Sequence, residues 1–208
     1  MRTLIVSNIM SVDGFYEGPS RDMMVLNMDE AFDAYNLERI RSADIVLLGR
    51  TSFEGFSSYW PGIVTAPADP DNRALSDVNR EVSRIYNQLP KAVVSDHYSV
   101  PEGNAWRDQT TVIAGADVND WVGASRGQGS GDILVFGSRS MWNSLLDQAL
   151  VDELHLMVSP NGVGSGTPIL DSAADLELLE ARRFDGSANV LLRYAVRREA
   201  LPTVASPA

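Results

Sequence analysis

The stretch DIVLLGRTSFEGF, residues 44–56, decides how the fold of this chain is interpreted. Four apolar residues, 45–48, run directly into Gly49, and this pattern predicts a buried strand that ends at a glycine. Arg50 and two hydroxyl residues follow at the predicted start of a helix. Because a glycine lets the backbone approach a ligand closely and a helix N-terminus attracts anions, the stretch predicts a phosphate-binding corner.

A second stretch, ILVFGSRSMWNSLL at residues 133–146, repeats the same pattern. An apolar strand is predicted to end at Gly137, and two serines flanking Arg139 lead into a helix. Two such corners at the carboxyl ends of strands in one sheet favour a ligand that carries several phosphates. The alternative is that each is an ordinary turn between strand and helix, because neither has the G-x-G-x-x-G or Walker pattern.

The rest of the chain alternates between apolar runs and amphipathic segments. Strands are predicted at residues 3–10, 44–49, 91–95, 110–115, 132–138 and 151–160, and helices at 28–41, 51–60, 76–89, 116–125 and 138–150. Two last strands, 176–184 and 189–197, form an antiparallel hairpin. The pattern predicts an α/β fold with a central mixed, mostly parallel sheet flanked by helices. We expect one domain over residues 1–198 and a disordered tail over 199–208.

Composition excludes several classes of protein. The formal net charge is −11, from 28 acidic and 17 basic residues, which argues against a nucleic-acid or membrane partner. There is no cysteine and there are only two histidines, so we predict no disulfide, no thiolate chemistry and no metal site. The N-terminal apolar run is too short for a signal peptide or a membrane helix. We therefore expect a cytoplasmic protein.

Several segments occur in the order and spacing of the dihydrofolate reductase-like family: VSNIMSVDGFYEG, VLLGRTSFEGF, KAVVSD, ILVFGSRSMWNSLL, LVDELHLMVSPNGVGSG and the final hairpin. Within that family the chain resembles the branch of the riboflavin-biosynthesis reductase domain and related bacterial reductases. The resemblance covers residues 2–198. It implies a dihydrofolate reductase-like fold, NADPH as hydride donor, a small-molecule substrate and a homodimer.

The resemblance also implies which residues bind the cofactor. Two residues of the first strand would lie near the nicotinamide, the loop after that strand would close over it, and the two corners would meet the phosphates. A serine after the strand at 91–95 would lie by the adenosine ribose. These residues are Ser7, Asn8, Asp13, Gly14, Gly49, Arg50, Thr51, Ser52, Ser95, Gly137, Ser138, Arg139, Ser140 and Met141.

The choice between NADPH and NADH depends on two residues of opposite charge. Asp96 stands where many relatives carry an arginine, and a carboxylate there repels a 2′-phosphate and accepts a hydrogen bond from a 2′-hydroxyl. Arg50 favours the phosphate. We predict NADPH, with NADH as the alternative.

The proton donor and the substrate pocket are also inferred from the resemblance. In dihydrofolate reductase a carboxylate on the helix before the G-R-x-T corner promotes protonation of the pterin, and the same spacing here leads to Asp33, with Asp29 one turn earlier. Partial burial would raise the pKa of either group; the alternative is that both are solvated acids. The substrate pocket is predicted to contain Phe15, Tyr59, Trp60 and Met157.

Met157 replaces a threonine of the folate enzymes, so the resemblance implies a substrate other than folate. We expect hydride transfer from NADPH to a C=N or C=C bond of a small, heterocyclic substrate of pterin, pyrimidine or imine type. The alternative is a nucleotide- or dinucleotide-binding protein without turnover, either a cofactor sensor or an inactive paralogue.

Overall fold

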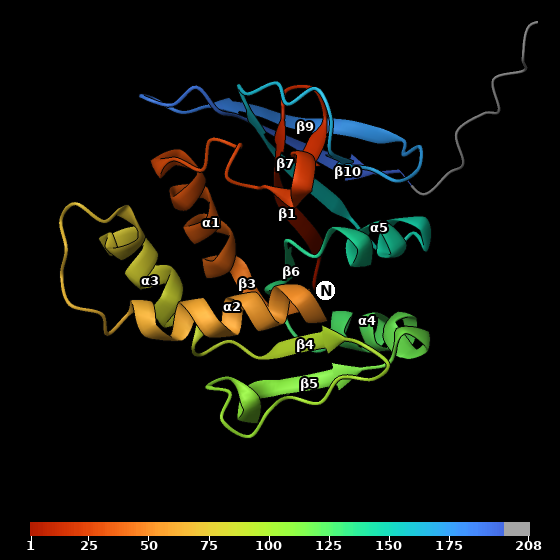
Figure 1. Ribbon diagram of the computed structural model, residues 1–208. Coiled ribbons are helices and arrows are strands. Elements are labelled where there is room, and N and C mark those ends of the chain that lie inside the picture. The colour runs from red at the N-terminus through yellow and green to blue at the C-terminus, as the bar shows by residue number, and fades with distance from the viewer. Residues whose placement is uncertain (198–208) are drawn as a thin grey trace, which may run out of the picture.

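The computed structural model describes residues 1–197 and contains an eight-stranded sheet in the order β5-β4-β3-β6-β1-β7-β10-β9 (Figure 1). Strand β10 is antiparallel to both of its neighbours, and every other pair in this sheet is parallel. The predicted mixed, mostly parallel sheet with a C-terminal hairpin is therefore confirmed. Its strands are β1 (Leu4–Ser11), β3 (Ala43–Gly49), β4 (Lys91–Val94), β5 (Thr110–Ile113), β6 (Asp132–Phe136), β7 (Glu153–Ser159), β9 (Leu176–Arg183) and β10 (Val190–Val196).

Helices cover both faces of the sheet. Leu4 of β1 belongs to a buried cluster with Val122 of α4 and Trp142 of α5. Its neighbour Ile5 belongs to another cluster, with Phe53 of α2 and with residues of α1 and α3. Because successive side chains of a strand point to opposite faces, α1, α2 and α3 pack on one face and α4 and α5 on the other (Figure 1). The helices are α1 (Glu30–Ser42), α2 (Arg50–Ile63), α3 (Asp77–Tyr86), α4 (Val118–Arg126) and α5 (Arg139–Asp147).

Two elements differ from the sequence prediction. A small second sheet pairs β2 (Phe15–Glu17) with β8 (Thr167–Pro168), whereas residues 11–20 were expected to form a loop. Helix α2 continues past its expected end at residue 60, because Ser83 of α3 donates to the carbonyl of Trp60 at 2.6 Å and accepts from the amide of Val64 at 3.1 Å. Both differences depend on contacts between segments far apart in the sequence.

Four short 3₁₀ helices complete the secondary structure, at Pro19–Arg21, Arg73–Leu75, Arg107–Gln109 and Gly115–Asp117. Within residues 1–197 no helix has both the length and the apolar character needed to cross a membrane. The tail expected at residues 199–208 lies outside the described residues.

The order of the strands determines where a ligand can bind. Strands β3 and β6 are parallel neighbours, yet α2 follows β3 on one face of the sheet and α5 follows β6 on the other. Where the helices that follow two neighbouring parallel strands pack on opposite faces of the sheet, a crevice opens at the carboxyl ends of those strands. The two corners identified from the sequence, Gly49 and Gly137, lie side by side at this crevice.

Lys91, the only lysine of the chain, is 1% exposed at the start of β4. Its Nζ donates to the carbonyl of Tyr86 and lies 4.3 Å from the centre of the Trp106 ring. Burial lowers the pKa of this amine from 10.5 to about 7. Above the folded-state pKa the folded protein has released this proton while the unfolded chain still holds it, so the free energy of unfolding rises with pH.

We expect Lys91→Met to remove this pH dependence. In the native protein Lys91 contributes a slope of up to about 1.4 kcal/mol per pH unit between pH 7 and 9, and methionine has no proton to release. Urea unfolding at pH 7, 8 and 9 measures the slope for both proteins. If the native protein and the variant had equal slopes of unfolding free energy against pH, burial would not lower the pKa of Lys91.

Candidate functional site

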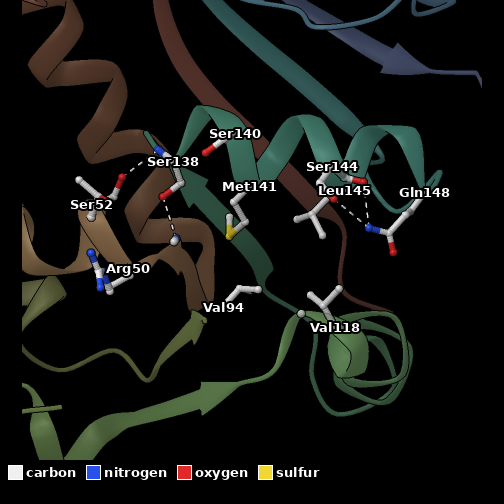
Figure 2. Close-up of a pocket in the computed structure, with 13 residues that line it drawn as sticks. Arg50, Ser52, Val94, Val118, Ser138, Ser140, Met141, Ser144, Leu145 and Gln148 are labelled. Carbon is white, nitrogen blue, oxygen red and sulfur yellow. Dashed lines mark hydrogen bonds between the residues drawn. The ribbon is translucent and has the colours of Figure 1, made fainter. Parts of the chain in front are cut away.

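The two strand-to-helix corners are joined by two hydrogen bonds. The amide of Gly49 donates to Ser138 Oγ at 2.8 Å, and the amide of Ser138 donates to Ser52 Oγ at 2.9 Å (Figure 2). Gly137 and Ser138 both have left-handed backbone conformations, with φ of 59° and 56°. A Cβ on Gly137 would lie 3.2 Å from Ser52 Oγ, so both the conformation and the close approach favour glycine there.

A smaller cavity of about 330 Å³ lies between these corners and the ends of β4 and β5. Figure 2 shows Met141 of α5 pointing into it, with Val94 and Val118 on the far wall and Arg50 at the side. The Arg50 side chain is 59% exposed and its nearest carboxylate, that of Glu54, is 3.8 Å away. The lining residues are Gly49, Arg50, Thr51, Ser52, Val94, Gly115, Val118, Ser138, Ser140, Met141, Ser144, Leu145 and Gln148.

A larger cavity of about 870 Å³ begins on the other side of the same corners. The two cavities share Thr51, Ser52, Ser138 and Ser140, so a long ligand can extend from one to the other through the corners. The larger one is mostly apolar and aromatic away from the corners. Its lining residues are Ser7, Asn8, Ile9, Tyr16, Glu17, Arg21, Met23, Met24, Met28, Phe32, Asn36, Thr51, Ser52, Gly55, Phe56, Trp60, Val82, Tyr86, Phe136, Gly137, Ser138, Arg139, Ser140 and Thr167.

Most of the residues expected to bind a cofactor line these two cavities. They come from the middle of β1, beside the end of β6, and from the two corners, and they lie together because β1, β6 and β3 are consecutive in the sheet. They are Ser7, Asn8, Gly49, Arg50, Thr51, Ser52, Gly137, Ser138, Arg139, Ser140 and Met141.

Asp13 and Gly14 do not line either cavity. The Asp13 carboxylate accepts hydrogen bonds from Ser11 Oγ and from the backbone amides of Val163 and Gly164. The bonds from Ser11 and Gly164 lower the pKa of Asp13 to about 2. This aspartate holds the loop after β7 against the loop after β1, and its expected place near the nicotinamide stays a prediction.

Ser95 also lies outside the lining, although Val94 before it and Gly115 nearby are part of the smaller cavity. Its amide is bonded to the carbonyl of Ile113. Asp96 Oδ1 accepts from the amide of Gly115 at 2.8 Å, so this carboxylate is held next to the smaller cavity.

Arg139 lines the larger cavity, but its guanidinium is paired with groups outside the cavity lining. Its guanidinium donates to the carbonyl of Pro168 and to the Asp171 carboxylate. The expectation that Arg139 offers its charge to a phosphate is therefore corrected: the side chain ties α5 to the segment after β8. Arg50 is the cation that remains at the smaller cavity.

The two candidate proton donors are turned away from the cavities. Asp33 accepts from Arg73 Nη1 at 2.7 Å and from Asn79 Nδ2 at 3.0 Å, in the contact between α1 and α3. Burial raises the pKa of Asp33, as expected, but the group does not line the site. Asp29 caps α1 by accepting from the amides of Ala31 and Phe32.

The orientation of α1 explains why the two carboxylates do not face the larger cavity. Within α1, Phe32 and Asn36 line the larger cavity, and the next residue in a helix points about 100° away. Asp33 follows Phe32 by one position, so its side chain lies off the face that forms the cavity. Asp29 lies before the first turn of the helix, where its carboxylate binds the backbone amides of Ala31 and Phe32. Neither carboxylate is retained here as a proton donor.

Of the expected substrate-pocket residues, Trp60 lines the larger cavity and the other three do not. Tyr59 is 45% exposed, and Met157 is 2% exposed in a core cluster. Phe15 is the β2 residue that pairs with Pro168. Alternation along β2 instead presents the next residue, Tyr16, to the site.

Sequence reasoning missed several lining residues. Tyr16 and Glu17 belong to the loop that was expected to close over a nicotinamide, so their position carried a signal. The lining residues of the segment 18–27, among them Arg21 and Met24, were not indicated by the sequence, because no periodic pattern marks that segment. Within residues 1–197 there is no cluster of three or more histidine or acidic side chains placed to bind a metal.

We expect Ser138→Ala to lower the free energy of unfolding by about 1 kcal/mol, because it removes the hydrogen-bond partner of the partly buried amide of Gly49. Ser140→Ala is the matched control: that serine lies in the same turn, is exposed and makes no side-chain hydrogen bond within the described residues. Urea denaturation at one pH measures both. Equal stability of the two variants would contradict the role assigned to the bonds between the corners.

The chain matches the model of the RibD C-terminal domain over residues 2–190. It is 23% identical over 188 residues to the uncharacterized protein YyaP of Bacillus subtilis, which covers 88% of this chain and 89% of that protein. A putative riboflavin biosynthesis protein from Shewanella sp. PV-4 has a similar structure, with a TM-score of 0.64 and 19% identity over 94% of this chain and 99% of that one.

Two other solved structures are similar. The deaminase/5-amino-6-(5-phosphoribosylamino)uracil reductase of Thermotoga maritima has a TM-score of 0.61 and 12% identity over 94% of this chain, which spans 57% of that protein. Dihydrofolate reductase from Enterococcus faecalis, complexed with NADP(H), has a TM-score of 0.57 and 13% identity over 93% of this chain and 96% of that one. With the sheet order and the paired corners, these matches show that the chain has a dihydrofolate reductase-like fold and belongs to the RibD C-terminal domain family.

Proposed function

We propose that this protein is an NADPH-dependent reductase that transfers a hydride to a C=N or C=C bond of a small heterocyclic substrate of pterin, pyrimidine or imine type. The observation that carries this proposal is the pair of cavities that meet at the corners. The smaller one is lined by the serines of the corners and by the exposed cation of Arg50; the other is large and apolar. A dinucleotide with phosphates at the corners would present its reactive ring to the apolar cavity. The names of the relatives support the same chemistry.

The residues at the corners fit a dinucleotide. The amides in the first turns of α2 and α5 have no partners within their helices and are available to phosphate oxygens. Gly137 leaves room for a backbone approach that a side chain would block. Arg50 adds a positive charge at the smaller cavity. In a protein with a net charge of −11, such local groups have to supply the attraction for an anion.

At the other end of the ligand, Asn8 is 7% exposed and lines the larger cavity. Its Nδ2 is buried without a hydrogen-bond partner in the described chain, and an unsatisfied buried donor is costly. A carbonyl of the ligand, such as the nicotinamide carboxamide, would satisfy it. When bound, the cofactor supplies the hydride, while the chain orients both rings and excludes water.

Reduction of a C=N bond also needs a proton. Glu17 is the only carboxylate among the residues that line the larger cavity, and its Oε1 accepts from Thr167 Oγ1 at 2.7 Å. We assign to Glu17 the role of passing a proton from solvent to the substrate, in place of Asp33 and Asp29.

A second candidate is a dinucleotide-binding protein without turnover, which is favoured by the absence of any α1 carboxylate from the cavity lining. The two candidates differ in one measurement. The reductase oxidises NADPH when an acceptor is supplied, and the binding protein holds NADPH but leaves it unchanged.

We expect Arg50→Ala to weaken NADPH binding about tenfold and NADH binding by much less, because a charge-assisted contact with the additional phosphate is lost. Titrations that follow energy transfer from tryptophan to the nicotinamide measure both affinities. Arg84→Ala, an exposed arginine paired with Glu81 on α3, is the control and should change neither. If the native protein preferred NADH, Asp96 and not Arg50 would determine the contact with the adenosine ribose.

We expect Glu17→Gln to lower kcat at least tenfold with little change in NADPH affinity, since glutamine cannot carry the proton. Asp33→Asn should keep kcat within about twofold, because Asp33 lies outside the cavity. The assay is acceptor-dependent NADPH oxidation with a panel of pterins, pyrimidines and cyclic imines. If Asp33→Asn alone abolished turnover, the proton would come from the α1 side after all.

A further inference from the structure

The larger cavity carries features that narrow the substrate class beyond a general heterocycle. Away from the corners, two helices and the segment before one of them present large apolar side chains to it. Phe32 comes from α1 and Met28 from the segment just before it, and Phe56 and Trp60 come from α2. Phe32 and Met28 pack on a core cluster around Ile9, so this wall is backed by the protein interior. Surfaces of this kind stack on flat rings.

Few charged side chains line this cavity, and most of them form hydrogen bonds or ion pairs with other residues. Of its lining residues only Glu17, Arg21 and Arg139 are charged. Arg139 is bound to Asp171, and Glu17 accepts from Thr167. Arg21 is exposed on the turn before α1, at the solvent side. A phosphate carried by the substrate would therefore lose its hydration without gaining a buried cation, and that exchange is unfavourable.

The polar side-chain groups on the walls that have no partner include two amides and the hydroxyl of Tyr86. Asn8 Nδ2 lacks a partner, as described, and Asn36 makes no side-chain hydrogen bond within the described residues while it shares the α1 face with Phe32. An amide presents one acceptor and one donor edge, which matches a neutral lactam edge. A protonated aminopyrimidine calls for a carboxylate instead, and α1 turns Asp29 and Asp33 away from the cavity.

We infer that the substrate is an uncharged, flat ring system with a lactam-type edge and no phosphate group. This inference rests on the proposed reductase function and deepens it. It separates this chain from the Thermotoga maritima relative, whose name specifies a phosphoribosylamino substrate. Asn36 would pair with the lactam, and the rings would lie against Phe32 and Trp60.

A suitable probe is quinoxalin-2(1H)-one, a neutral bicycle with a lactam and a C3=N4 bond. Its reduction balances as follows: C3 receives the hydride from NADPH, N4 receives one proton, and 3,4-dihydroquinoxalin-2(1H)-one and NADP⁺ are formed. The matched charged probe is the same ring with a 2-phosphooxyethyl group on a carbon of its benzene ring, so that the lactam edge is unchanged. Isothermal titration calorimetry measures NADPH binding first, and then binding of each probe to the protein with and without NADPH.

We expect the neutral probe to bind at least tenfold more tightly than the phosphorylated one. Phe32→Ala and Asn36→Ala should each weaken the neutral probe about tenfold and leave NADPH affinity unchanged. Tyr59→Ala is the control, because Tyr59 neighbours Trp60 but lies outside the cavity. Asn36 is partly exposed and has no partner to lose, so its variant remains informative if Phe32→Ala does not fold.

The outcomes distinguish the inference about the substrate class from the proposed reductase function. Equal or tighter binding of the phosphorylated probe overturns the inference, and so does failure of the neutral probe on a protein that binds NADPH. Unchanged probe binding in both cavity variants also overturns it. If NADPH does not bind while the neutral probe does, with the expected variant pattern, the reductase proposal fails and the ligand class of the cavity is supported.

Discussion

Two backbone-to-serine hydrogen bonds at the carboxyl ends of β3 and β6 determine the architecture of the site. They join Gly49 to Ser138 and Ser138 to Ser52, so the starts of α2 and α5 are held together although the two helices pack on opposite faces of the sheet. The crevice between them opens into one cavity on each side. The bonds use the hydroxyls of Ser52 and Ser138 as acceptors, and the first-turn amides are left for a ligand.

Electrostatics at the site is local. The chain is strongly acidic, and an arginine that seemed available for a phosphate, Arg139, is neutralised by Asp171. What remains at the corners is the field of two helix N-termini and the exposed cation of Arg50. Asp96 is held close by through the amide of Gly115. In the proposed reductase, the choice between NADPH and NADH would depend on the balance between one cation and one anion near the smaller cavity.

The larger cavity combines an apolar interior with very little titratable chemistry. Burial raises the pKa of Tyr16 to about 12, so this phenol keeps its proton at neutral pH, and Glu17 is the single carboxylate in the lining. In the proposed reductase this lining would shield the reacting rings from water, and Glu17 would pass the proton from solvent to the substrate. Such a site suits a substrate that is itself neutral and flat, and the unsatisfied amide of Asn8 marks where a carbonyl of a bound ligand is expected.

The sequence by itself determined the α/β class, the hairpin and the location of both corners, because these follow from local patterns: apolar strands that end at glycine, and helices that begin with serine or arginine. The cofactor-binding candidates came from the resemblance to the dihydrofolate reductase-like family, and those at the two corners also follow from these patterns. The identity of the cavity-facing residue on each element was decided only by the tertiary structure. Successive side chains differ in direction by about 100° in a helix and by half a turn in a strand. A shift of one position therefore separates Asp33, which points away from the cavity, from Phe32, which lines it. In the same way Tyr16 faces the cavity and Phe15 does not. The engagement of Arg139 and the pairing of β2 with β8 likewise depend on residues about thirty to 150 positions apart, which no local pattern encodes.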